Sequence, residues 1–324
     1  MADEPLSDRV DRIIDALVAR EDATAALGDV ETAPLARVAA ELRYYPRREF
    51  TTRLRAQLEG RTMMAGAVAA RNVRAGFTSV TPYVWVPDRG FADFVVRVFD
   101  AVETSATDNP GHGTHRELRI GSSMLMIGET GEHSGTAPPR PVAFHVFVED
   151  ADAVFARALN AGGTSLGEPA DRPYGERSGF IRDAYGNRWY IATSLGPSAV
   201  PKELRTITPF LHAQNVGEYI GFLARAFGAV EEARHEIPGH GVPYARVRIG
   251  DAAVEMGGPA DPMPGAYFLY VDDADAVYAR ALAAGASSLS APADRPTGDR
   301  IAFVADPLGN HWYIAQSTET FSEV

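Results

Sequence analysis

Apolar positions along most of this chain alternate between the spacing of a strand and that of a helix. Residues 80–86 are rich in β-branched and aromatic side chains and predict a strand, whereas the apolar residues from Phe91 to Phe99 recur at helical spacing. Residues 115–120 and 124–127 predict two strands joined by a tight turn. The same order returns over residues 142–193. The pattern therefore predicts a β-α-β-β-β unit that occurs twice in succession.

A longer repeat contains this unit. Residues 162–194 are nearly repeated at 285–317, and residues 150–159 are nearly repeated at 273–282. Each copy spans about 115 residues, which is the size of one domain and too long for a solenoid repeat. The chain therefore holds two copies of one domain, and we expect four β-α-β-β-β units between residues 77 and 318.

Residues 1–75 do not belong to the repeat. Apolar residues spaced as in helices, from Val10 to Val18 and from Leu35 to Leu58, predict a small α-helical domain followed by a linker. Its first half is acidic and its second half basic, which indicates either a helical hairpin with compensating faces or a docking surface for a partner protein. We expect an α+β chain with three domains, at residues 1–75, 76–197 and 198–324.

Composition narrows the classes of function. The 324 residues are 45% hydrophobic, include no cysteine and carry a formal net charge of −12. The absence of cysteine excludes disulfides and thiolate chemistry, and the acidic balance argues against a nucleic-acid partner. No apolar run is long enough to span a membrane, and the N-terminus lacks the basic and apolar pattern of a signal peptide. We expect a cytoplasmic globular protein.

Five short motifs occur in the same order in both copies. In the first copy they are Val80-Thr-Pro-Tyr83, Arg119-Ile-Gly121, Val148-Glu-Asp150, Gly175-Glu-Arg177 and Asp183-Ala-Tyr-Gly-Asn-Arg-Trp189. In the second they are Ile207-Thr-Pro-Phe210, Arg248-Ile-Gly250, Val271-Asp-Asp273, Gly298-Asp-Arg300 and Asp306-Pro-Leu-Gly-Asn-His-Trp312. The chain thereby resembles the glyoxalase, bleomycin-resistance and extradiol-dioxygenase superfamily, also called vicinal oxygen chelate proteins, and within it the PhnB-like branch. The resemblance implies two tandem glyoxalase-like domains, each wrapping a curved sheet around a cleft.

The resemblance also implies where a catalytic divalent metal would be held. Members with metal chemistry use His or Gln on an opening strand, His on the next opening strand and Glu on a closing strand. The matching positions here are Thr81, Ala143 and Tyr190 in the first copy and Thr208, Ala266 and Tyr313 in the second. None is a usual ligand for a catalytic divalent ion. We therefore expect neither a metal nor another cofactor.

Aromatic residues on the strands predict a ligand pocket. His145 lies two residues beyond Ala143 and hence on the same face of its strand, where it could line a cleft with Thr81, Tyr83 and Tyr190. The alternative for His145 is a structural histidine that is hydrogen-bonded in a polar cavity. The expected ligand-binding residues are Thr81, Tyr83, Trp85, His145, Tyr190, Phe210 and Tyr313. We place the principal cleft along Tyr83, His145 and Tyr190.

Two residues of the second copy are candidates for catalysis. His212 lies on the predicted opening strand, and Glu255 is a carboxylate inside a predicted central strand. Such a pair could exchange a proton with a substrate or form half of a metal site. The alternative is that both have ordinary packing or solvated roles. Arg177 and Arg300 are expected to form ion pairs with the loop carboxylates Asp171 and Asp294.

The sequence thus favours a metal-free protein that sequesters an aromatic or hydrophobic small molecule, in the manner of bleomycin-resistance proteins. The alternative is a divalent-metal lyase, isomerase or dioxygenase with displaced ligands such as His115, His145, His212 and Glu255. A scaffold that docks a partner through the N-terminal helices is a third possibility. We expect the two copies to pack as an intramolecular pseudo-dimer, because a short linker holds them at high effective concentration.

Overall fold

A computed structural model of the chain describes residues 73–74, 76–110, 113–130, 140–237, 241–257, 263–295 and 298–317. The predicted N-terminal helices lie outside these residues. The described residues all belong to one compact unit. None of its helices is both long and apolar enough to cross a membrane.

The four predicted β-α-β-β-β units are present. The first contains β1 (Val80–Val86), α4 (Gly90–Phe99), β2 (Val102–Asn109), β3 (Gly113–Ile120) and β4 (Ser123–Glu129). The second contains β5 (Ala143–Phe147), α5 (Ala151–Asn160), β6 (Thr164–Arg172), β7 (Glu176–Arg182) and β8 (Arg188–Ser194). The third contains β9 (Ile207–His212), α6 (Val216–Phe227), β10 (Val230–Ile237), β11 (Gly241–Ile249) and β12 (Ala252–Gly257). The fourth contains β13 (Ala266–Tyr270), α7 (Ala274–Ala284), β14 (Ser287–Asp294), β15 (Asp299–Ala305) and β16 (His311–Ser317).

The strands form two eight-stranded sheets, and each sheet takes one unit from each copy. Units two and three form the order β10-β11-β12-β9-β5-β8-β7-β6, which we call the middle-unit sheet. Units one and four form the order β14-β15-β16-β13-β1-β4-β3-β2, which we call the outer-unit sheet. Antiparallel pairs β5–β9 and β1–β13 join the copies at the centres of the two sheets. The expectation that each copy would wrap its own sheet around a cleft is therefore corrected.

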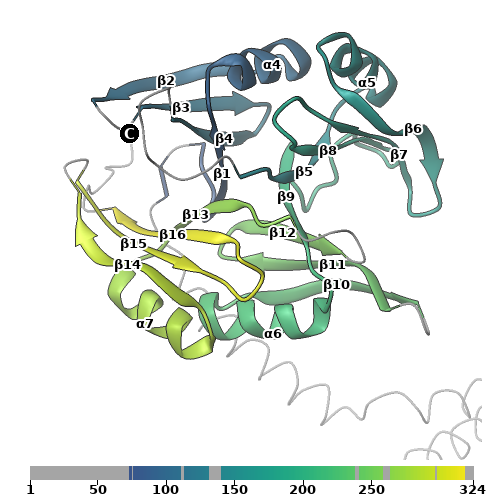
Figure 1. The fold of residues 1–324 in the computed structure, drawn as a ribbon. Coiled ribbons are helices and arrows are strands. Elements are labelled where there is room, and N and C mark those ends of the chain that lie inside the picture. Colours follow the sequence, from purple (N-terminus) through teal and green to yellow (C-terminus); the bar gives the residue numbers. More distant parts are fainter. Residues whose placement is uncertain are drawn as a thin grey trace, which may run out of the picture. The chain divides into compact units, whose positions relative to one another are not determined.

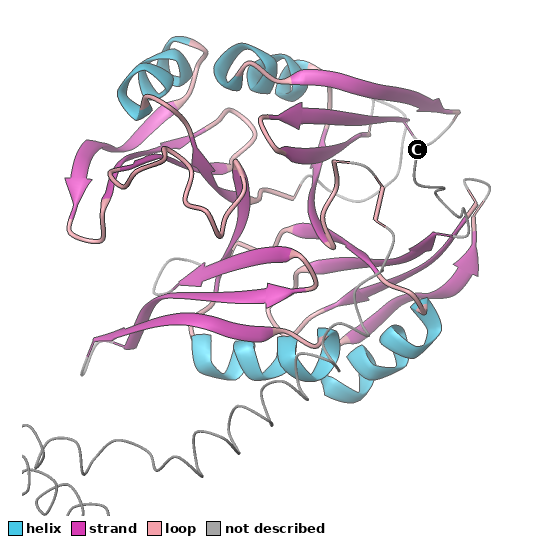
Figure 2. Cartoon of the chain, turned by 180° about the vertical axis from the view of Figure 1, so that it is seen from behind, coloured by secondary structure: helices cyan, strands magenta, loops and turns pink. Residues whose placement is uncertain are grey.

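The helices of the two units of a copy pack on each other, although the strands of those two units lie in different sheets. α4 packs on α5, and α6 packs on α7 (Figures 1 and 2). Their buried faces, including Phe91 and Val95 of α4 and Leu223 and Phe227 of α6, contribute to one hydrophobic core that contains strand residues of all four units. Burial of this apolar surface is the main force that holds the copies together.

The repeated sequence motifs have local structural roles. The Asp150 and Asp273 side chains accept hydrogen bonds from the backbone N–H groups of Ala153 and Ala276, at 3.0 and 2.9 Å, and so cap α5 and α7. The Arg177 and Arg300 guanidinium groups pair with Asp171 and Asp294 at 3.0 and 2.9 Å, which confirms their predicted structural role.

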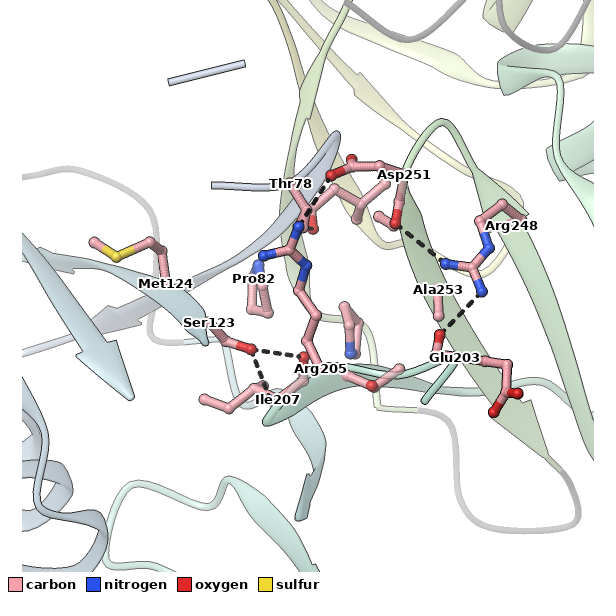
Figure 3. A pocket seen from close by; sticks show the side chains of 14 residues that line it. Thr78, Pro82, Ser123, Met124, Glu203, Arg205, Ile207, Arg248, Asp251 and Ala253 are labelled. Carbon is pink, nitrogen blue, oxygen red and sulfur yellow. Dashed lines mark hydrogen bonds and ion pairs between the residues drawn. The ribbon is translucent and has the colours of Figure 1, made fainter. Parts of the chain in front are cut away.

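A small cavity marks the joint between the copies (Figure 3). On one side the Ser79 N–H and hydroxyl donate to Asp251 Oδ1 at 2.7 and 2.8 Å, and Arg205 approaches Asp251 Oδ2 at 3.4 Å. On the other side the Ile207 N–H donates to Ser123 Oγ at 2.8 Å. The cavity measures about 20 Å³, room for about one water molecule. We interpret it as part of the joint and not as a ligand site.

Candidate functional site

One face of the middle-unit sheet borders a cavity of about 640 Å³. Strands of both copies contribute to its wall, and five of its side chains carry aromatic six-membered rings. The lining residues are His145, Tyr174, Glu176, Ser178, Phe180, Tyr190, Phe210, His212, His235, Ile237, Pro243, Tyr244 and Gly257. A cavity of this size could enclose a small organic molecule.

Rings from neighbouring strands form the apolar part of the wall. Tyr190 of β8 contacts Phe180 of β7 and Phe210 of β9, with ring centroids 5.3 and 4.9 Å apart. Tyr174, in the β6–β7 turn, is 65% exposed although it also lines the cavity. The aromatic wall thus continues from half-buried rings on the sheet to the surface.

The polar part of the wall is organised by His145. Its Nδ1 lies 2.8 Å from Glu255 Oε2, and its Nε2 lies 3.3 Å from Glu176 Oε2. The Tyr244 hydroxyl donates to the other oxygen of Glu255 at 2.8 Å. The Glu255 side chain is only 1% exposed, whereas the Glu176 side chain is 16% exposed and lines the cavity.

Electrostatics in this cluster favour a charged histidine. Burial lowers the pKa of His145, but the neighbouring Glu255 and Glu176 carboxylates outweigh burial and raise this pKa to about 10. Burial and the Glu255 charge likewise raise the pKa of Tyr244, so its hydroxyl stays protonated and donates to Glu255.

A second polar pair lies on the same sheet. His212 Nε2 is 2.9 Å from the Tyr190 hydroxyl, and His212 Nδ1 is 3.5 Å from an Arg188 guanidinium nitrogen. Burial raises the pKa of Tyr190. This pair offers hydrogen-bonding groups to a molecule that lies against the rings of Tyr190 and Phe210.

The outer-unit sheet has aromatic and apolar side chains where the middle-unit sheet has its polar cluster. In the middle-unit sheet, His145 pairs in register with Tyr190, and Phe210 with Glu255. The equivalent register pairs in the outer-unit sheet are Phe268 with Tyr313 and Tyr83 with Met126. Tyr83, Phe268 and Tyr313 pack on one another with ring centroids 5.2 to 6.1 Å apart. These side chains cluster with Phe77 and Met124. The two sheets have therefore diverged at their centres.

This arrangement corrects the predicted cleft. Tyr83 lies on β1 of the outer-unit sheet, whereas His145 and Tyr190 lie on β5 and β8 of the middle-unit sheet. Thr81, Trp85 and Tyr313 also belong to the outer-unit sheet, where the Trp85 Nε1–H donates to the Tyr313 hydroxyl at 2.7 Å. The cause is the strand order, because the first strand of each copy pairs across the copies.

His212 and Glu255 lie on neighbouring strands, but the hydrogen bonds of Glu255 go to His145 and Tyr244. The pairing of Glu255 with His212 is thus replaced by a pairing with the histidine of the other copy. Sequence reasoning missed Glu176 and Tyr244 altogether. Glu176 belongs to the Gly-Glu-Arg motif. It lies two residues before Ser178, so both polar side chains share one face of the strand, and this was the available signal.

Of the histidines proposed as displaced metal ligands, His145 and His212 line the cavity, whereas His115 does not. His115 lies on β3 of the outer-unit sheet, 3.4 Å from both Tyr83 and Glu117, away from the strands that carry His145 and His212. Across the described residues, no three His, Asp or Glu side chains are arranged to hold a metal ion. Both ring nitrogens of His145 face carboxylates, so the described part of the chain presents no ready site for a divalent ion.

Comparison with known proteins agrees with the four-unit architecture. The model of the Glyoxalase/Bleomycin resistance protein/Dioxygenase superfamily matches residues 89–191 and 210–314. An uncharacterized protein of Mycobacterium bovis is 36% identical over 123 residues, which cover 35% of this chain and 81% of that protein. A second M. bovis protein, named "Putative glyoxylase CFP32", is 30% identical over 215 residues, 62% of this chain and 81% of that protein.

Among solved structures, glyoxalase I from Zea mays aligns with 73% of this chain and 92% of its own, with a TM-score of 0.59 and 15% sequence identity. At that identity the likeness concerns the fold alone. The family model, by contrast, matches the sequence of both copies across more than half of the chain. This chain therefore belongs to the Glyoxalase/Bleomycin resistance protein/Dioxygenase superfamily.

Proposed function

We propose that the cavity of the middle-unit sheet binds and sequesters a small, flat and largely apolar molecule, without a metal ion. The observation that carries this proposal is the contrast between the two sheets. At equivalent central positions, the outer-unit sheet packs aromatic side chains on one another, whereas the middle-unit sheet borders a cavity of about 640 Å³. The rings of the middle-unit sheet thus border space that a ligand could occupy.

The wall suits such a ligand. Phe180, Tyr190 and Phe210 offer ring faces, and rings hold planar molecules at low cost in conformational entropy. His212 and Tyr190 add hydrogen-bonding groups that could orient the ligand.

The experiment compares two double variants at equivalent positions. Tyr190→Ala with Phe210→Ala removes two rings from the cavity wall, and Tyr313→Ala with Tyr83→Ala removes their counterparts from the outer-unit sheet. A ligand found by screening planar compounds should bind the first variant about 10- to 100-fold more weakly, since each ring contributes roughly 1 kcal/mol or more. Titration calorimetry measures the affinity, and circular dichroism checks the fold. Unchanged affinity in the first variant, or its loss only in the second, contradicts the proposed cavity.

The alternative function is a metal-dependent lyase, isomerase or dioxygenase, which the name of the M. bovis relative supports. The same screen distinguishes it, because turnover of a hemithioacetal or a catechol that depends on added divalent metal would favour the enzyme. We favour the binding protein because both ring nitrogens of His145 already face carboxylates, Glu255 at 2.8 Å and Glu176 at 3.3 Å, so that neither nitrogen is available to a metal ion.

A further inference from the structure

The His145 side chain faces a carboxylate at each of its two ring nitrogens. Glu255 Oε2 lies 2.8 Å from Nδ1, and Glu176 Oε2 lies 3.3 Å from Nε2. A carboxylate can only accept a hydrogen bond, and a neutral imidazole carries a proton on only one nitrogen. Both contacts are therefore satisfied together by an imidazolium that donates from both nitrogens.

The charges of the cluster do not balance without this imidazolium. Among the residues that the structure describes, Glu176 and Glu255 each form their ion pair with His145. The nearby arginines have other partners: Arg246 pairs with Glu232 at 3.1 Å, and Arg188 approaches His212. Two carboxylates in one place, of which Glu255 is buried and Glu176 is 16% exposed, need a cation, because an unpaired buried charge is costly.

The fold itself does not require these charges. At the positions equivalent to His145 and Glu255, the outer-unit sheet has the apolar residues Phe268 and Met126. Replacing a buried ion pair by packed apolar residues is often neutral or stabilising. Charges at these two positions are thus not a demand of the sheet.

We propose that the His145 imidazolium is the resident cation of the cavity: it holds Glu176 and Glu255 together in the place where an acidic site would otherwise recruit a divalent metal ion. This inference concerns the same cavity as the proposed function, and it rests on that function because the cavity is where the ligand would bind. Its test measures only the binding of a cation. The proposal for His145 and the proposal of a ligand-binding cavity can therefore fail independently. The high pKa of His145 agrees with a charge that persists at neutral pH.

The experiment uses the full chain, stripped of metals with a chelator, and Mn²⁺ as the probe. His145→Ala leaves two carboxylates facing a space without a cation. This variant should bind one Mn²⁺ at least tenfold more tightly than the wild type does, as measured by the electron paramagnetic resonance signal of free Mn²⁺. Mn²⁺ should also raise the melting temperature of the variant and leave that of the wild type unchanged.

Two controls assign the effect. Phe268→Ala opens a comparable space at the equivalent position, where Met126 takes the place of Glu255. The carboxylate in register with Met126, Glu117, is already paired with Arg74 at 2.7 Å, so this variant should gain no Mn²⁺ binding. Adding Glu255→Gln to His145→Ala should remove the gain. Stoichiometric Mn²⁺ binding by the wild type that His145→Ala abolishes would overturn the proposal, because His145 would then be a metal ligand. A folded His145→Ala variant without any gain would overturn it as well.

If His145→Ala does not fold, a measurement on the wild type alone still tests the proposal. Nuclear magnetic resonance of protein labelled with ¹⁵N-histidine reports the protonation of each ring nitrogen. The groups around His145 are the Glu176 and Glu255 carboxylates, with the Tyr244 hydroxyl bound to Glu255. We expect both ring nitrogens of His145 to carry a proton at pH 7 and still at pH 9. A neutral tautomer at pH 7 would overturn the proposal.

Discussion

The charge on His145 makes the stability of the chain depend on pH. Because Glu255 and Glu176 raise its pKa in the folded state to about 10 from an ordinary value of 6.5, the folded chain keeps this proton over a range in which the unfolded chain loses it. The stabilisation is complete below pH 6.5 and disappears as the pH rises through about 10. We expect the free energy of unfolding to fall over this range, as measured by urea denaturation at several pH values.

His145→Gln provides the comparison, since it keeps a polar side chain and cannot titrate. The difference in stability between wild type and variant should be largest near pH 6 and shrink toward pH 10. At pH 7 the substitution should cost about 3–5 kcal/mol, the usual effect of removing one partner from a buried ion pair. Parallel pH profiles of the two proteins would show that His145 is not charged in the folded state.

At the scale of elements, a buried aspartate fixes each turn between the last two strands of a copy. Asp183 Oδ1 accepts the backbone N–H groups of Tyr185 and Asn187 at 2.9 and 3.0 Å, and its Oδ2 accepts Trp189 Nε1–H at 2.9 Å. Gly186, at φ +88°, allows the turn to close. This geometry explains why the motif from Asp183 to Trp189 recurs at Asp306 to Trp312 with the same spacing of Asp, Gly, Asn and Trp.

Asp183→Ala should therefore destabilise the chain by about 3 kcal/mol or more, because it leaves the buried Trp189 N–H and two backbone N–H groups without an acceptor. Asp150→Ala is the matched control: it removes a single exposed N-cap bond and should cost about 1 kcal/mol. Urea denaturation measures both. Equal losses in the two variants would refute the role assigned to the turn.

At the scale of the whole molecule, neither copy contains a complete sheet. β1 pairs with β13 and β5 pairs with β9, so a separated copy would expose the edges of two central strands and the apolar surface beside them. We expect residues 1–197 and 198–324, expressed separately, to self-associate or remain unfolded. Mixed during refolding, they should form a 1:1 complex, which size-exclusion chromatography with light scattering detects. Two folded monomeric fragments would contradict this expectation.

The sequence by itself determined the units. Strand and helix periodicity depends on neighbours within a few residues, and the Asp caps and the Asp183 turn are local as well, so the β-α-β-β-β order and the two copies could be predicted directly. The residues of the site were also visible one at a time. His145, Tyr190, Phe210, His212 and Glu255 all lie on the strands that border the cavity or hold its charged cluster.

Only the tertiary structure decided which of these residues meet. Periodicity says which face of a strand a residue occupies, but it carries no information about which strand lies beside it. Two similar copies add to this ambiguity, because a unit can pair with its neighbour in the chain or with a unit of the other copy at similar local cost. The pairing of β5 with β9 brought His145 to Glu255 and separated both from Tyr83. The cavity is thus a consequence of strand order, which long-range burial selects.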